Sequence, residues 1–142
     1  MSTIKTNTLT GTTSAGVINV TGEGGSTTTN LQQGLAKVWV NFDGTATDAA
    51  ARDSLNVSGM TDNGTGDYTV TIANDMSNNF YCIGSHTQRD ISITENANVV
   101  SYQNNYDTAH AVGSFRVGTT RSDNNSHEDH KAVMLSVHGD LA

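Results

Sequence analysis

The residues best suited to metal chemistry lie together near the C-terminus, in His127-Glu128-Asp129-His130, with Asp123 shortly before them. Neutral imidazole and carboxylate oxygen are ligands for zinc and similar divalent ions, so His127 and His130 are the candidate metal ligands. A His-x-x-His pair in a loop lacks the fixed face that a helix provides, and residues 121–126 have the composition of an exposed turn. A solvated loop is the alternative, and we expect neither a bound metal nor another cofactor.

A second polar stretch, Asp62-Asn63-Gly64-Thr65-Gly66-Asp67, superficially resembles a calcium-binding loop. It lacks the glutamate at the twelfth position and the alternating ligands of an EF-hand. Asp, Asn and Gly close hairpins, which explains the stretch without a metal. The remaining carboxylates have no spacing typical of a hydrolase, including one that cleaves surface glycans with paired acids. We therefore expect no catalytic residues and no enzymatic activity.

Three tyrosines, Tyr81, Tyr102 and Tyr106, lie beside polar segments and are the candidate ligand contacts. An exposed tyrosine at the edge of a sheet can stack on a sugar ring. The alternative is that each ring packs against its sheet and leaves only its hydroxyl in water.

Trp39 is the candidate interface residue within the main domain. It alternates with Val38 and Val40, so its ring leaves the opposite face of the strand and must cover a second apolar surface. That surface is either a neighbouring subunit or a short helix over Thr47–Asp53, for which Thr47 is a suitable N-cap.

The elements that position these residues are short strands. Leu55–Met76 reads as a hairpin in which Tyr68, Val70 and Ile72 share one face, with Thr61–Asp67 as its turn. Five further strands are predicted at Phe80–His86, Ile91–Thr94, Val99–Tyr102, Ser114–Thr119 and Lys131–His138. Many short strands, frequent turns and almost no helix predict an all-β fold, an antiparallel β-sandwich or jelly-roll. Cys82, the one cysteine, is expected to be a small buried residue of its strand.

The chain is expected to divide after Gly34. Residues 1–34 would form an anchoring or oligomerisation segment with a Gly/Thr-rich linker, and residues 35–142 a β-sandwich knob. The segment has two short strands, Ile4–Leu9 and Gly16–Thr21, which are too poor in apolar surface to hold themselves together in water. We therefore expect its apolar residues to contact another surface; they include Ile4, Leu9, Val17, Ile18 and Val20.

Composition excludes several classes of function. The 142 residues carry a net charge of −7 and scattered cations, which excludes a nucleic-acid-binding surface. No apolar run approaches the roughly 20 residues that span a bilayer, so we expect no membrane insertion. Only 35% of residues are hydrophobic, and such a thin core favours association with other copies.

Three strings in the chain resemble proteins of one group. Ser2-Thr3-Ile4-Lys5-Thr6-Asn7-Thr8-Leu9 is similar to the start of virion appendage proteins of marine tailed phages, including cyanophages. The strings Ala36-Lys37-Val38-Trp39-Val40-Asn41-Phe42-Asp43-Gly44-Thr45 and Arg52-Asp53-Ser54-Leu55-Asn56-Val57-Ser58 resemble a C-terminal module of the same proteins. The resemblance implies a homotrimer and an architecture, and it carries no active site.

From this resemblance we expect a structural protein of the virion, made in the host cytoplasm. A tail fibre has a long shaft, and a chain of 142 residues has room for almost none, so a short fibre or a head or tail decoration fits better. Its N-terminal segment would dock on another virion protein. The alternative is a receptor-binding tip that recognises a glycan or protein of the host surface.

Overall fold

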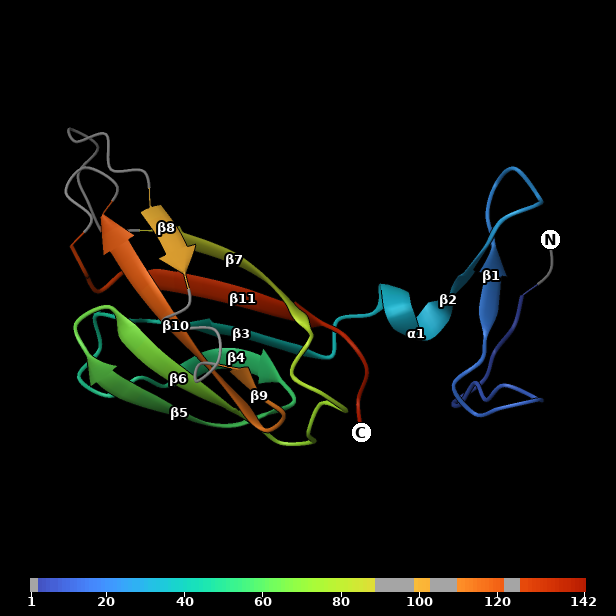
Figure 1. Cartoon of the computed structure of the whole chain (residues 1–142), viewed down its shortest axis with the longest axis horizontal. Coiled ribbons are helices and arrows are strands. Elements are labelled where there is room, and N and C mark those ends of the chain that lie inside the picture. The colour runs from blue at the N-terminus through green and yellow to red at the C-terminus, as the bar shows by residue number, and fades with distance from the viewer. Residues whose placement is uncertain (1–2, 89–98, 103–109, 122–125) are drawn as a thin grey trace. The chain divides into compact units, whose positions relative to one another are not determined.

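The computed structural model describes residues 3–88, 99–102, 110–121 and 126–142, and for 99–102 it describes the backbone alone (Figure 1). The chain divides into two compact units, Met1–Leu35 and Ala36–Ala142, which we call the N-terminal unit and the C-terminal domain. The predicted strand Ile91–Thr94 and Tyr106 lie outside the described residues.

The N-terminal unit contains one small hairpin and one turn of helix. Strands β1 (Asn19–Thr21) and β2 (Thr28–Asn30) pair antiparallel, and α1 (Leu31–Gly34) follows directly. Asn30 caps this turn, because its side-chain oxygen accepts the backbone N–H of Gln32 at 2.8 Å. The hairpin is the only paired backbone between strands in residues 3–35.

Of the two strands predicted in this unit, one is confirmed in part and the other is wrong. Gly16–Thr21 is confirmed in its last three residues, which form β1. The predicted strand Ile4–Leu9 is wrong, since residues 4–9 pair with no strand in the described part of the chain. A strand needs a partner for its backbone N–H and C=O groups, and local composition cannot supply one.

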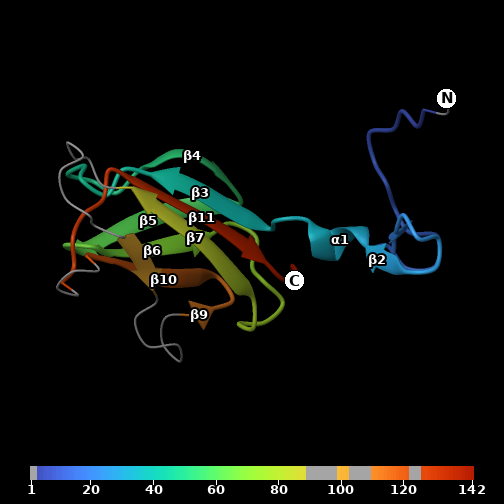
Figure 2. The same ribbon diagram turned by 90° about the horizontal axis from the view of Figure 1, so that it is seen from above.

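Two antiparallel sheets face each other in the C-terminal domain (Figures 1 and 2), which confirms the predicted all-β sandwich. The first, the β3 sheet, has the order β4-β3-β11-β7 and consists of β3 (Val38–Phe42), β4 (Ala51–Leu55), β7 (Cys82–Gln88) and β11 (Ala132–His138). The second, the β6 sheet, has the order β5-β6-β10-β8, with a short β9 also paired to β10. It consists of β5 (Val57–Gly64), β6 (Asp67–Ile72), β8 (Val99–Tyr102), β9 (His110–Ala111) and β10 (Ser114–Arg121).

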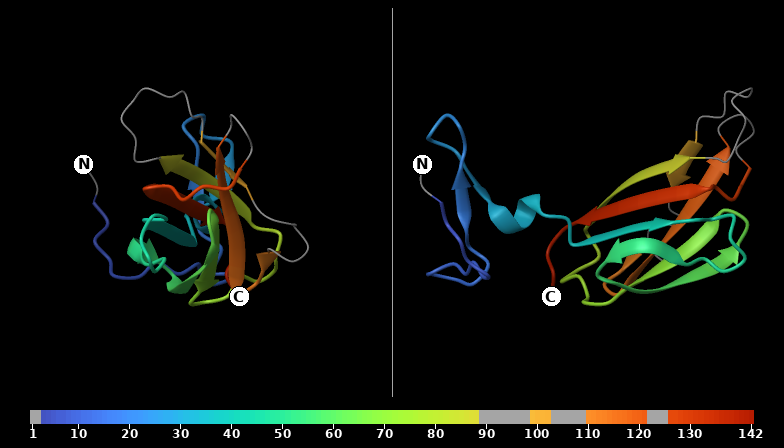
Figure 3. Two further views of the ribbon diagram at one scale, coloured as in Figure 1. Left: turned by 90° about the vertical axis from the view of Figure 1, so that its left-hand side faces the viewer. Right: turned by 180° about the vertical axis from the view of Figure 1, so that it is seen from behind.

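Figure 3 shows the two sheets from two further sides. The core lies between them and is built by residues that alternate along the strands. In β3 the side chains of Val38, Val40 and Phe42 are buried, as the period of two predicted. Phe42 meets Tyr68 of the opposite sheet edge to face, with ring centroids 4.9 Å apart. The core residues are Val38, Val40, Phe42, Tyr68, Val70, Ile72, Met76, Tyr81, Phe115, Val117, Val133, Leu135 and Val137.

The predicted hairpin is confirmed, but its turn is shorter than expected. Strands β5 and β6 continue to Gly64 and from Asp67, so only Thr65 and Gly66 connect them. Gly64 and Gly66 have φ values of 132° and 64°, the left-handed region that glycine adopts without strain. Thr61–Asp67 is therefore mostly paired strand and not the turn itself.

The predicted helix over Thr47–Asp53 is wrong. Ala51–Leu55 forms β4 and pairs with β3, with Trp39 opposite Leu55 and Asn41 opposite Asp53. Alanines raise helix propensity, but that preference is small, and here pairing with the edge of β3 overrides it. Trp39 thus has no helix to cover.

Asn56 is the corner at which the chain leaves one sheet and enters the other. It adopts φ 58°, a conformation that asparagine tolerates better than most residues. Its side-chain nitrogen donates to the carbonyls of Lys37 at 3.2 Å and Asn74 at 3.0 Å. Its side-chain oxygen accepts the N–H of Asn74 at 2.7 Å. These bonds tie both sheets to one residue.

Candidate functional site

The two candidate metal ligands occupy different environments. His130 is fully buried, and its Nε2 lies 3.8 Å from a carboxylate oxygen of Glu128. His127 is exposed, with Nδ1 3.3 Å from the carbonyl oxygen of Gly66. In the described part of the chain no three His, Cys, Asp or Glu side chains gather closely enough to hold a metal ion. The structure therefore does not bring His127 and His130 to one solvent-facing site.

Tyr81 is wrong as a ligand contact, because its ring is part of the core. Its hydroxyl lies 2.9 Å from the carbonyl oxygen of Ala111 and 3.0 Å from that of Ser114. Its ring stacks on His110 with centroids 4.7 Å apart. Tyr102 is described only by its backbone, which pairs with Gly118, and its side chain lies outside the described structure, as all of Tyr106 does.

Asp67 and Asp43 form ion pairs with arginine side chains of the same domain. Arg116 donates from Nε to Asp67 Oδ1 at 2.7 Å and also pairs through its terminal nitrogen, which holds the pKa of Asp67 below its usual value. A hydrogen bond from Thr45 likewise lowers the pKa of Asp43, which also pairs with Arg52 at 2.7 Å. Carboxylates kept anionic in this way are poor general acids.

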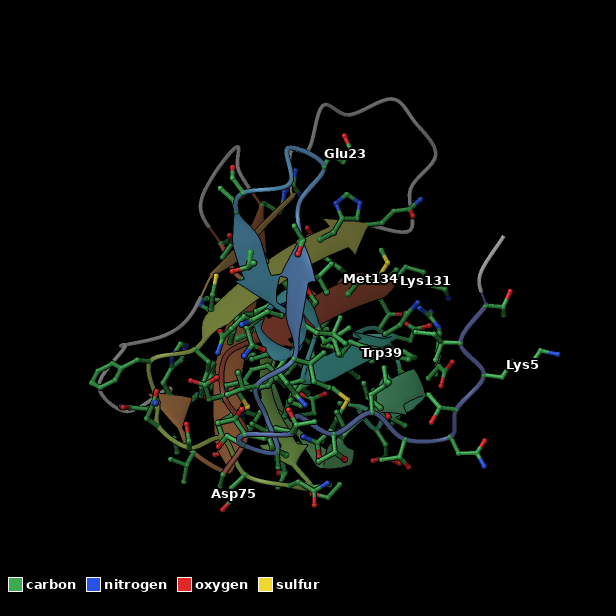
Figure 4. All side chains as sticks on the ribbon, turned by 90° about the vertical axis from the view of Figure 1, so that its right-hand side faces the viewer. Lys5, Glu23, Trp39, Asp75, Lys131 and Met134 are labelled. Carbon is green, nitrogen blue, oxygen red and sulfur yellow. The ribbon has the colours of Figure 1, made fainter. Side chains whose placement is uncertain are left out.

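Trp39 leaves the outer face of the β3 sheet, on the side away from the core, as its alternation with Val38 and Val40 predicted. Its neighbours across the sheet are Leu55 on β4, which is 47% exposed, and Ser136 on β11. Met134 lies on the same face of β11 (Figure 4). Trp39 is the only tryptophan of the chain, so this face carries its one indole ring.

Two residues of β7 complete this outer face. His86 is the register partner of Met134, and Gly84 is the register partner of Ser136. We call the set Trp39, Gly84, His86, Met134 and Ser136 the outer β3 face. The sequence analysis selected only Trp39 from it. Cys82 also points outward and is exposed, so its predicted burial is wrong.

The predicted anchor residues of the N-terminal unit are uncovered. Ile4 is 85% exposed and Leu9 57%, and none of residues 3–35 is buried. Val17 and Val20 are also exposed, while Ile18 is half-buried. Their role as an interface stays a prediction.

Comparisons of this chain with protein-family models, with curated proteins and with solved structures find no match. No helix in the described residues is long and apolar enough to cross a membrane.

Proposed function

We propose that this chain is a structural protein of a tailed-phage particle, a short trimeric fibre or decoration subunit. In this proposal the N-terminal unit docks on another virion protein, and the C-terminal domain is displayed on the particle. The resemblance of Ser2–Leu9 and Ala36–Thr45 to virion appendage proteins motivates the assignment. The observation that carries the docking role is the uncovered apolar surface of the N-terminal unit.

The hairpin β1–β2 supports this role because it has too little surface to be stable alone. Isolated two-stranded hairpins are marginal in water, and this one has no buried residue to pack against. Burial of apolar side chains such as Val20, which is 49% exposed, would stabilise the hairpin on a partner. A completed strand pairing would add backbone hydrogen bonds to that burial.

The distribution of charge along the chain also favours docking through the N-terminal unit and display of the C-terminal domain. Lys5 and Glu23 are the only charged side chains in residues 1–35, and they cancel. The whole net charge of −7 therefore belongs to the C-terminal domain. Copies joined through neutral N-terminal units would meet no repulsion there, while their acidic domains would stay apart.

A deletion tests the proposal. Removal of residues 1–35 should leave the C-terminal domain folded, since its core draws no residue from the N-terminal unit. The truncated protein should not join phage particles when it is expressed during infection. Mass spectrometry of purified particles provides the measurement, and full-length protein provides the control. Incorporation of the truncated protein at the full-length level would contradict docking through this unit.

A second candidate function is recognition of a glycan on the host surface by the displayed domain. The outer β3 face favours it, because it presents the half-buried ring of Trp39 beside the hydroxyl-bearing Ser136. Binding of the isolated domain to host cells, competed by host polysaccharide, would support this function. In a trimer, three weak sites would act together through effective concentration.

A further inference from the structure

The outer β3 face contains a hollow of about 370 Å³ over strands β7 and β11. It is lined by Gly84, Ser85, His86, Met134, Leu135 and Ser136. A volume of this size lies at the lower end of the range for small-molecule sites.

Gly84 keeps the floor of the hollow open. A Cβ atom at this position would lie 3.2 Å from the hydroxyl oxygen of Ser136, its partner across the sheet. Any side chain here would therefore stand over that hydroxyl. Glycine inside a strand weakens the strand and often marks a place where a ligand approaches the backbone closely. Ser136 is half-buried.

The side chains around the floor differ in chemistry. His86 and Met134 face each other across β7 and β11 one step along the strands. Trp39 of β3 is the register partner of Ser136 on the side away from Gly84. A ligand over Ser136 would thus have an indole ring on one side, and an imidazole and a thioether at the next pair along the strands.

The charge of the site restricts its ligand. Among the residues that the structure describes, no Asp, Glu, Lys or Arg side chain lines the hollow. The domain around it is acidic, with the net charge of −7, so an anionic ligand would be repelled. The complementary ligand is uncharged, with hydroxyl groups for Ser136 and His86 and an apolar face for Trp39.

We propose that the outer β3 face binds one ring of a neutral saccharide. The indole of Trp39 packs against the C–H face of the ring, and Ser136 and His86 form hydrogen bonds to its hydroxyl groups. This inference rests on the second candidate function, glycan recognition, and gives that function a location.

A second copy of the chain fits this face less well. The centre of a stable subunit interface is poor in charged side chains and rich in large apolar ones. Here Asp53, Asn41 and His86 lie on the same face as Trp39, and two like-charged domains would have to meet. An open hollow with the Ser136 hydroxyl at its floor suits a small hydrated ligand better.

Trp39 is the only tryptophan of the chain, so intrinsic fluorescence reports on this face alone. Full-length protein would be titrated with neutral methyl pyranosides of gluco, galacto, manno, rhamno and N-acetylgluco configuration. We expect a saturable change in emission with at least one of them. Gly84→Val fills the hollow with a residue favoured in strands and should weaken the response at least tenfold.

Phe80→Ala is the matched control, since it removes an aromatic ring that is 79% exposed but does not line the hollow. It should leave the response unchanged, and circular dichroism should show both variants folded. Three results would overturn the proposal: no saturable change with any pyranoside, an equal response in Gly84→Val, or emission that follows protein concentration instead of sugar. The last would assign the face to a second copy. Incorporation into particles is scored separately, so loss of sugar binding leaves the docking proposal standing.

Discussion

The hydroxyl of Tyr68 donates a hydrogen bond to Oδ1 of Asp129 at 2.7 Å, joining side chains that lie 61 residues apart. The same oxygen accepts the N–H of Gly66 at 2.6 Å, and the carbonyl oxygen of Gly44 lies 3.1 Å from the hydroxyl. Burial, and then the Asp129 carboxylate, raise the pKa of Tyr68. One carboxylate thus connects the hairpin turn, the core and the segment before β11.

Tyr68→Phe should destabilise the C-terminal domain without changing its fold. The ring keeps its packing against Phe42, but a hydrogen bond to a charged acceptor is lost, which costs about 2 kcal/mol of unfolding free energy. Tyr81→Phe is the matched control, because it removes the bonds of a hydroxyl to the neutral carbonyls of Ala111 and Ser114, which costs about 1 kcal/mol. Urea denaturation followed by Trp39 fluorescence measures both. Equal losses of unfolding free energy in the two variants would mean that the hydrogen bond to the Asp129 carboxylate is no stronger than the bonds to neutral carbonyls.

Removal of Asp67 should make the domain less sensitive to acid. Arg116 keeps the pKa of Asp67 below its ordinary value of 3.8, so the unfolded chain takes up this proton first as the pH falls. The stability that Asp67 contributes is complete above pH 3.8 and is lost below it, as the pH falls through the lowered pKa. In Asp67→Asn, and equally in Arg116→Gln, the fall in stability between about pH 7 and about pH 3 should be smaller. Acid denaturation curves parallel to the wild type would contradict this assignment.

Gly66→Ala should be among the most damaging small substitutions in the domain. Its φ of 64° costs about 1–2 kcal/mol for an L-residue. The new Cβ would also lie 2.5 Å from the carbonyl oxygen of Thr119 and 2.7 Å from the nitrogen of Glu128. Gly59→Ala in the same hairpin meets no atom within 4 Å and should be nearly neutral. The thermal midpoints of the two variants distinguish the sites, and a similar Tm for both would refute the steric explanation.

The core of the domain was predictable because alternation is a local property. Tyr68, Val70 and Ile72 were selected by their period of two, and all three are buried. The helix predicted over Thr47–Asp53 was wrong because the competing interaction, pairing with β3, is not local. The strand predicted at Ile4–Leu9 is missing for a related reason, since no strand in the described part of the chain pairs with it. Local patterns specify which side chains alternate, and they do not specify what a strand pairs with.

The outer β3 face was missed for a related reason. Alternation in Lys131–His138 places Met134 and Ser136 opposite the buried Val133, so each strand could be divided into two faces from its sequence. What the sequence does not contain is the register that sets Gly84 beside Ser136. Tyr81 was misjudged because its polar neighbours suggested exposure, whereas its hydroxyl reaches backbone carbonyls 30 and 33 residues away.

Val20→Asp should weaken association of the full-length chain. Val20 lies on β1 opposite Thr29, and an aspartate there would place a charge where the hairpin now exposes an apolar side chain. If copies associate through the face of β1 that carries Val20, burying that charge is costly, and the protein should shift toward the 15.0 kDa monomer in sedimentation velocity. Thr21→Asp adds the same charge to the neighbouring exposed residue on the opposite face of β1, so it controls for net charge.

The face is assigned correctly only if Val20→Asp dissociates the oligomer and Thr21→Asp does not. Equal dissociation by both would attribute the effect to charge alone, and a wild-type protein that sediments as a monomer at all concentrations would remove the basis for a self-associating hairpin.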